Sequence, residues 1–135
     1  MSCLETYATL RIFSADLTPD VISERLGVAA TEAIPRDPAS KYKVRREANF
    51  WGWSTEGRVE STDNQLHVRA ILAMLEGKAP LLRALRASGC EIDVSNFWVS
   101  NGQGGPNLEA SDLDGLSSLS LPIWWDVYFG EQPET

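Results

Sequence analysis

The feature that most constrains this chain is a regular alternation of apolar and polar residues near its start. Ala8, Leu10 and Ile12 occupy every second position of the segment Tyr7–Phe13, which is the period of a β-strand with one buried face. Such a strand belongs to a sheet, and the buried face of a sheet needs a second layer to cover it. The alternation therefore predicts a layered domain with a sheet covered on one side.

A well-marked helix follows this strand and supplies part of that second layer. Thr18 stands at a capping position, and Pro19 follows at the first helical position, where a missing N–H is no loss. Gly27 permits the left-handed conformation that ends many helices. The sequence therefore predicts a helix that begins at Pro19 and ends just before Gly27.

Two further strands are predicted beyond a loop. Ala29–Ser40 shows no period and contains two prolines, so we expect a connecting loop there. Lys41–Glu47 and Phe50–Glu60 have the pattern of extended segments, and Ala48-Asn49 suits the turn of a hairpin between them. The basic residues of the first segment would then share one strand face.

The second half of the chain predicts two helical regions that alternate with two strands. Leucines at helical spacing mark the helical regions, and apolar runs mark the strands. The first helical region starts at a Thr62–Gln65 capping box, breaks at Gly77 and Pro80, and ends at Gly89. A strand at Glu91–Val99 follows it. A helix capped by Ser111 and a strand at Ile123–Phe129 complete the order.

This order of elements predicts one α+β domain that spans residues 1–135. The first six elements follow the ferredoxin-like β-α-β-β-α-β order, and an α-β unit is added at the end. We expect an antiparallel or mixed sheet with helices mainly on one face, and a disordered tail at Glu131–Thr135. The chain shows neither a membrane-spanning run nor a signal peptide, so we expect a cytoplasmic protein.

The charge of the chain limits its partners. The formal net charge is −7, and no Lys or Arg follows Arg86, whereas eight Asp and Glu residues do. An acidic surface repels nucleic-acid phosphates and anionic lipids. We therefore expect no nucleic-acid and no membrane partner, and a basic protein is the favoured partner.

The inventory of reactive residues predicts no catalytic or metal site. Cys3, Cys90 and the single histidine His67 are too few to form a zinc site. Cys90 has the position of a small core residue. No cofactor-binding motif is present, so we expect no cofactor, and the question of enzyme activity stays open with a preference against it.

Several short motifs, taken in order, resemble those of a bacterial family filed as domain of unknown function 4279. They are Ala8–Phe13, Leu17-Thr18-Pro19, Gly52-Trp53-Ser54, Leu66-His67, Gly104-Gly105-Pro106 and Asp126–Phe129. The resemblance covers nearly the whole chain and departs in Ala29–Ser40, where an expected glycine is missing. It implies a small α+β domain and brings no activity, cofactor or catalytic residue.

The tryptophans indicate where a binding surface lies. The chain has five, and strand alternation prevents all of them from being buried. If Trp125 faces the helices, then Trp124, Asp126 and Tyr128 share the opposite, open face. Aromatic side chains beside carboxylates suit a binding surface. The favoured function is thus a non-enzymatic interaction domain that engages a basic protein, as immunity proteins do; Trp53 and Trp98 are further candidate binding residues.

Two alternatives stay open. A small-molecule binder or enzyme would place its pocket near His67 and the Gly104-Gly105 loop, because backbone N–H groups of such a loop can hold an anion. A homodimer would bury the open faces against each other, which makes the aromatic residues structural. On the open face, Asp93 and Asp126 would be the candidate carboxylate pair for acid–base chemistry or cation binding.

Overall fold

The computed structural model describes residues 3–130, so the tail predicted at Glu131–Thr135 lies outside the described residues. Within that range the fold is α+β, as predicted, with five strands and five helices. The strands are β1 (Cys3–Ser14), β2 (Glu32–Ile34), β3 (Asn49–Ser54), β4 (Glu91–Ser100) and β5 (Ile123–Phe129). The helices are α1 (Pro19–Leu26), α2 (Lys43–Glu47), α3 (Asn64–Met74), α4 (Ala79–Ala87) and α5 (Ala110–Ser118).

The strands form one mixed sheet with β1 at its centre. The strand order is β2-β3-β1-β4-β5. The pairs β2–β3, β3–β1 and β1–β4 are antiparallel, and β5 runs parallel to β4. The connection from β4 to β5 passes through α5, because parallel neighbours need a long crossover. The ferredoxin-like detail stays a prediction.

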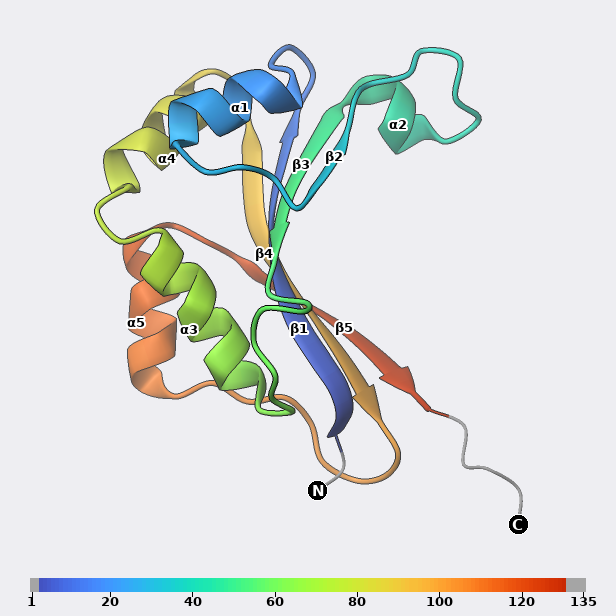
Figure 1. The fold of residues 1–135 in the computed structure, drawn as a ribbon, viewed down its shortest axis with the longest axis vertical. Coiled ribbons are helices and arrows are strands. Elements are labelled where there is room, and N and C mark those ends of the chain that lie inside the picture. The colour runs from blue at the N-terminus through green and yellow to red at the C-terminus, as the bar shows by residue number, and fades with distance from the viewer. Residues whose placement is uncertain (1–2, 131–135) are drawn as a thin grey trace.

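Four helices cover one face of this sheet and leave the other open. Figure 1 shows α1, α3, α4 and α5 on one side, whereas α2 stands apart on the other. Ala8, Leu10 and Ile12 of β1 are fully buried beneath the helices, which confirms the alternation that predicted a covered sheet. The hydrophobic effect of burying this face is the main driving force of the fold.

Local capping chemistry fixes α1 as predicted. The Thr18 side chain accepts a hydrogen bond from the Val21 N–H, and Pro19 opens the helix. Gly27 ends it in the left-handed region with φ of 73°. The indole N–H of Trp51 in β3 donates to Ser23 Oγ at 2.8 Å, so the helix is tied to the sheet by a polar contact as well as by packing.

The hairpin predicted between Lys41–Glu47 and Phe50–Glu60 is wrong. Residues Lys43–Glu47 form α2. Lys43 Nζ lies 3.9 Å from Glu47 Oε1, a pair at the i, i+4 spacing of a helix. The strand that pairs with β3 is instead β2, inside the segment predicted to be a loop. Lys, Arg and Glu are good helix formers, and this intrinsic preference outweighed the alternation of basic and apolar residues.

The remaining helices agree with the prediction except at their caps. The interrupted pattern before Gly89 is two helices in tandem, α3 and α4. The cap of α3 is Asp63, one residue after the predicted position, and the cap of α5 is Glu109 instead of Ser111. No helix among residues 3–130 is long and apolar enough to cross a membrane.

Candidate functional site

The open face is the sheet face opposite α1, α3, α4 and α5, and it carries the strongest candidate site. Strand pairing places Tyr7 beside Phe97, and Phe97 beside Asp126 on β5. Trp124 and Tyr128 lie on the same face of β5 as Asp126 and are 61% and 51% exposed. The predicted grouping of Trp124, Asp126 and Tyr128 is therefore present, and Tyr7 and Phe97 of the neighbouring strands extend it.

Three aromatic rings form a row across the open face. Tyr7 and Phe97 stack with ring centroids 4.7 Å apart and an interplanar angle of 21°. Phe97 and Tyr128 follow with centroids 5.4 Å apart. We call Tyr7, Phe97 and Tyr128 the aromatic row. It spans β1, β4 and β5, so it offers a continuous ring surface instead of isolated side chains.

Carboxylates surround the Tyr7 end of this row. Burial raises the pKa of the Tyr7 phenol, and the charges of Glu56, Glu5, Asp126 and Glu32 raise it further. The pKa of Tyr128 is also raised, chiefly because its hydroxyl donates a hydrogen bond to Asp126. Both shifts have the sign expected where negative charge gathers. The aromatic row therefore lies in a negative field.

At the opposite end of the open face, an arginine neutralises the negative charge. Arg11 makes a bidentate pair with Asp93, with distances of 2.7 and 2.8 Å, and its guanidinium also stacks over Phe13. Asp93 faces the open side as expected, but its charge is already matched. The pairing of Asp93 with Arg11 counts against the alternative in which Asp93 and Asp126 act together as a carboxylate pair.

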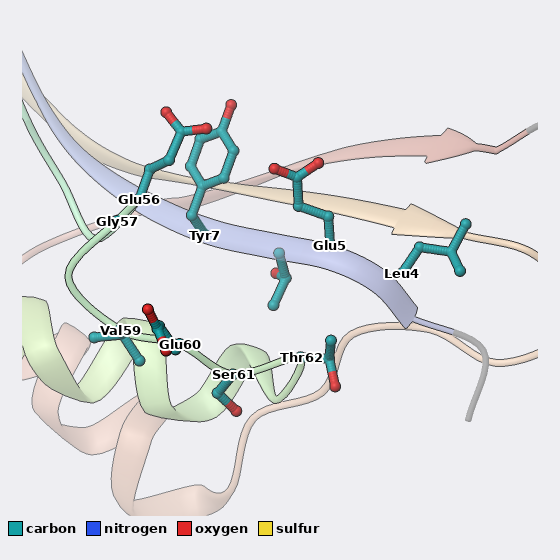
Figure 2. Close-up of a pocket in the computed structure, with 10 residues that line it drawn as sticks. Leu4, Glu5, Tyr7, Glu56, Gly57, Val59, Glu60, Ser61 and Thr62 are labelled. Carbon is teal, nitrogen blue, oxygen red and sulfur yellow. The ribbon is translucent and has the colours of Figure 1, made fainter.

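A groove of about 620 Å³ runs along the outer edge of β1, beside the aromatic row. In Figure 2, Glu5, Tyr7 and Glu56 project to the same side of the strand, and the segment that carries Glu60 passes on the other side. The residues that line this groove include three carboxylates and no Lys or Arg. The negative field of the open face therefore continues into the groove.

On the side that faces this groove, β1 has no partner strand before Thr9. Ala8 exchanges hydrogen bonds of 2.9 Å with the Thr55 side chain and main chain. Because strand groups alternate sides, Thr6 turns its N–H and C=O in the same direction, into the groove. β3 pairs with β1 only from Thr9 onward, so on this side no strand among the described residues borders β1 at Thr6, whereas β4 pairs with the other side.

His67 is buried in a hydrogen-bonded network and is 1% exposed. Nε2 lies 2.8 Å from the Ser61 carbonyl oxygen, which accepts only, so Nε2 carries the proton. Nδ1 then accepts from the Thr55 hydroxyl, whose oxygen accepts in turn from the Ala8 N–H. Both ring nitrogens are used within the fold. This arrangement counts against the enzyme alternative that relied on His67.

The Gly104-Gly105 loop lies in the exposed connection between β4 and α5. Asn107 ties the end of this connection to α3: its carbonyl oxygen accepts from Asn64 Nδ2 at 2.7 Å, and its side chain accepts from Gln65. Leu108 packs against the core. The loop thus serves as a tethered link between elements.

The sequence model of the family described as "Domain of unknown function (DUF4279)" matches residues 4–130. The chain belongs to the DUF4279 family. No curated protein and no solved structure matches it. Among the described residues of this DUF4279 domain, no group of three His, Cys, Asp or Glu side chains is placed to hold a metal ion.

The tryptophans of this DUF4279 domain differ in exposure from strand to strand, and β5 exposes its tryptophans on both sheet faces. Trp51 and Trp98 are buried, whereas Trp124 and Trp125 are exposed. Trp98 is only 3% exposed and does not belong to the open face. Trp53 lies on the helix-covered face, partly packed against the core, with Arg58 over its ring. Of the candidate tryptophans, Trp124 alone reaches the open face.

Sequence reasoning missed the inner half of the site in this DUF4279 domain. Tyr7 and Phe97 were not singled out, although the alternation that buries Ala8 also turns Tyr7 outward. Glu56 lies in a loop, and no periodic pattern marks it. Only the strand order brings these residues beside Asp126.

Proposed function

We propose that this chain is a cytoplasmic, non-enzymatic interaction domain whose open face binds a positively charged protein. The observation that carries the proposal is the aromatic row set in a negative field, with the charges of four carboxylates acting on Tyr7. A Lys or Arg side chain is attracted both to an aromatic ring face and to carboxylates. The exposed Trp124 adds contact area beside the row.

The physical reason for a protein partner is the shape of this surface. The row crosses three strands, with Tyr7 and Phe97 half-buried and Tyr128 exposed, so it presents a broad area. Broad, partly aromatic surfaces suit protein partners better than small molecules, which prefer concave pockets. A complementary charge on the partner speeds association and favours one orientation.

The test compares two charge-neutralising variants with the same net charge. Asp126→Asn removes a carboxylate from the open face, and Glu76→Gln removes one from the turn between α3 and α4. The probe is an arginine-rich peptide, titrated calorimetrically at low and moderate salt, with a glutamate-rich peptide as negative control. We expect Asp126→Asn to weaken binding about fivefold or more, which is about 1 kcal/mol, and Glu76→Gln to change it less than twofold.

Equal weakening by the two variants would show that only net charge attracts the peptide, and it would sink the proposal. Trp124→Ala supplies a second readout that charge alone does not move. It leaves every carboxylate in place and removes an aromatic side chain that is 61% exposed. We expect Trp124→Ala to weaken binding with no change in the folded circular dichroism spectrum.

A further inference from the structure

The outer edge of β5 is the most exposed apolar element of the fold. Because β5 ends the strand order, no strand among the described residues borders its outer side (Figure 1). Five of its side chains are large, apolar and exposed on both faces of the sheet. They are Trp124 at 61%, Trp125 at 41%, Val127 at 42%, Tyr128 at 51% and Phe129 at 80%.

The main-chain groups on this edge are arranged for a further strand. Pro122 O accepts from the Val94 N–H, and the Gly130 N–H donates to Ser100 O. The main-chain N–H and C=O groups of the even-numbered residues of β5 therefore point toward β4. By alternation the odd-numbered residues, among them Trp125 and Val127, point their N–H and C=O groups outward. Natural edge strands are usually blocked by lysine, proline or a bulge. β5 has none of these, and its register with β4 is regular.

We infer that a second copy of this chain pairs with β5, antiparallel and about a twofold axis at Val127. In this register Val127 faces Val127 of the second copy, and Trp125 faces Phe129 of the second copy. Both are pairs of outward-pointing residues, so each pair exchanges two N–H···O=C hydrogen bonds. The two subunits thus contribute the same patch, as a closed dimer requires.

Charge selects this register over its neighbour. Asp126 is the one charged residue of β5. An axis at Asp126 would place two carboxylates opposite each other at a non-hydrogen-bonded site, where Cα atoms are about 4.5 Å apart and like charges are destabilising. With the axis at Val127, Asp126 faces Tyr128 of the second copy, whose hydroxyl is a donor.

The exposed side chains of β5 set an upper bound on the area that a dimer buries. A fully exposed aromatic side chain presents roughly 150–250 Å², so the five side chains expose roughly 600 Å² per copy. Two copies expose roughly 1,200 Å², which is the lower limit of specific interfaces and an upper bound here, because Trp124 and Tyr128 keep part of their area on the open face. A groove of about 460 Å³, lined by Leu108, Leu113, Trp125 and others, lies on the helix-covered side of β5. Phe129 of the second copy would lie beside it.

This inference does not depend on the proposed function and adds a consequence to it. Edge pairing joins two sheets in one plane, so Trp124, Asp126 and Tyr128 stay on the open face. The two negative aromatic surfaces would become one continuous surface. A basic partner would then meet two equivalent sites, which increases its overall affinity.

The first test measures mass by sedimentation over a dilution series. We expect a wild-type dimer that dissociates on dilution. Val127→Pro removes an outward N–H without removing a bond to β4, and proline is tolerated on sheet edges. We expect it to raise the dimer dissociation constant at least tenfold, whereas the control Val127→Thr keeps the N–H and the wild-type mass. A wild-type monomer at every concentration would overturn the inference.

The second test locates the axis and does not require the proline variant to fold. In a Cys3→Ser background, Val127→Cys places two thiols at the proposed axis, within the Cα separation that a disulfide accepts. We expect mild oxidation to link Val127→Cys quickly and Asp126→Cys slowly. The reverse order would overturn the register. Unchanged arginine-peptide binding in a dimeric Asp126→Asn variant would contradict the proposed function and leave the dimer standing.

Discussion

Replacing His67 by phenylalanine tests whether this residue is structural. The change keeps a ring in the core but leaves the Thr55 hydroxyl and the Ser61 carbonyl without their partner. Thr55 is fully buried, so its orphaned hydroxyl bears a desolvation cost of about 1–3 kcal/mol. Ser61 is half-buried and can turn to water. We expect a loss of about 2 kcal/mol in unfolding free energy, or a fall of roughly 6–8 °C in Tm.

Urea unfolding, followed by tryptophan fluorescence and circular dichroism, measures this loss. A double-mutant cycle with Thr55→Val then isolates the contact. Thr55→Val orphans the Ala8 N–H and His67 Nδ1, but the double variant orphans fewer groups than the two single variants together. The double variant should lose about 1–2 kcal/mol less than the sum of the single losses. Additive losses, or a loss below about 0.5 kcal/mol in His67→Phe, would refute the structural role.

Two further predictions concern titration. The Arg69 hydrogen bonds lower the pKa of Asp112 from its ordinary 3.8. The Asp112 carboxylate therefore contributes its full stabilisation of the folded state above pH 3.8, and this stabilisation is lost as the pH falls through the lowered pKa. The stability gap between wild type and Asp112→Asn should therefore close on acidification; a gap independent of pH would contradict this. Glu56→Gln should lower the raised pKa of Tyr7 toward 10.0, measured as the phenolate absorbance that Tyr7→Phe removes; an unchanged titration would show that the field has another source.

Elements with local signals were predictable from the sequence. The cap, proline and closing glycine of α1 lie within ten residues of one another and specify its ends. The bounds of β5 also agree with the prediction, since its apolar run follows a proline. In both cases the information lies within the segment, so no knowledge of distant residues was needed.

Elements defined by distant contacts were not predictable. β2 has three residues and exists because Glu32, Ala33 and Ile34 pair with β3. A three-residue strand shows no measurable period. α2 buries no residue, so its sequence carries no apolar stripe to distinguish helix from strand. The same limit applies to the site: alternation placed Asp126 on the open face, but only strand order placed Tyr7 beside Phe97.

The side of β1 that has no partner strand at Thr6 bears on how this protein resists aggregation. An exposed strand edge is a template on which other chains can grow, and carboxylates beside it repel acidic copies of the same chain. Glu5, Glu56 and Glu60 surround the edge at Thr6, so identical molecules are kept from it electrostatically. The side of β1 at Thr6 and the outer edge of β5 thus differ in charge. Three glutamates oppose self-association at β1, whereas β5 carries a single carboxylate.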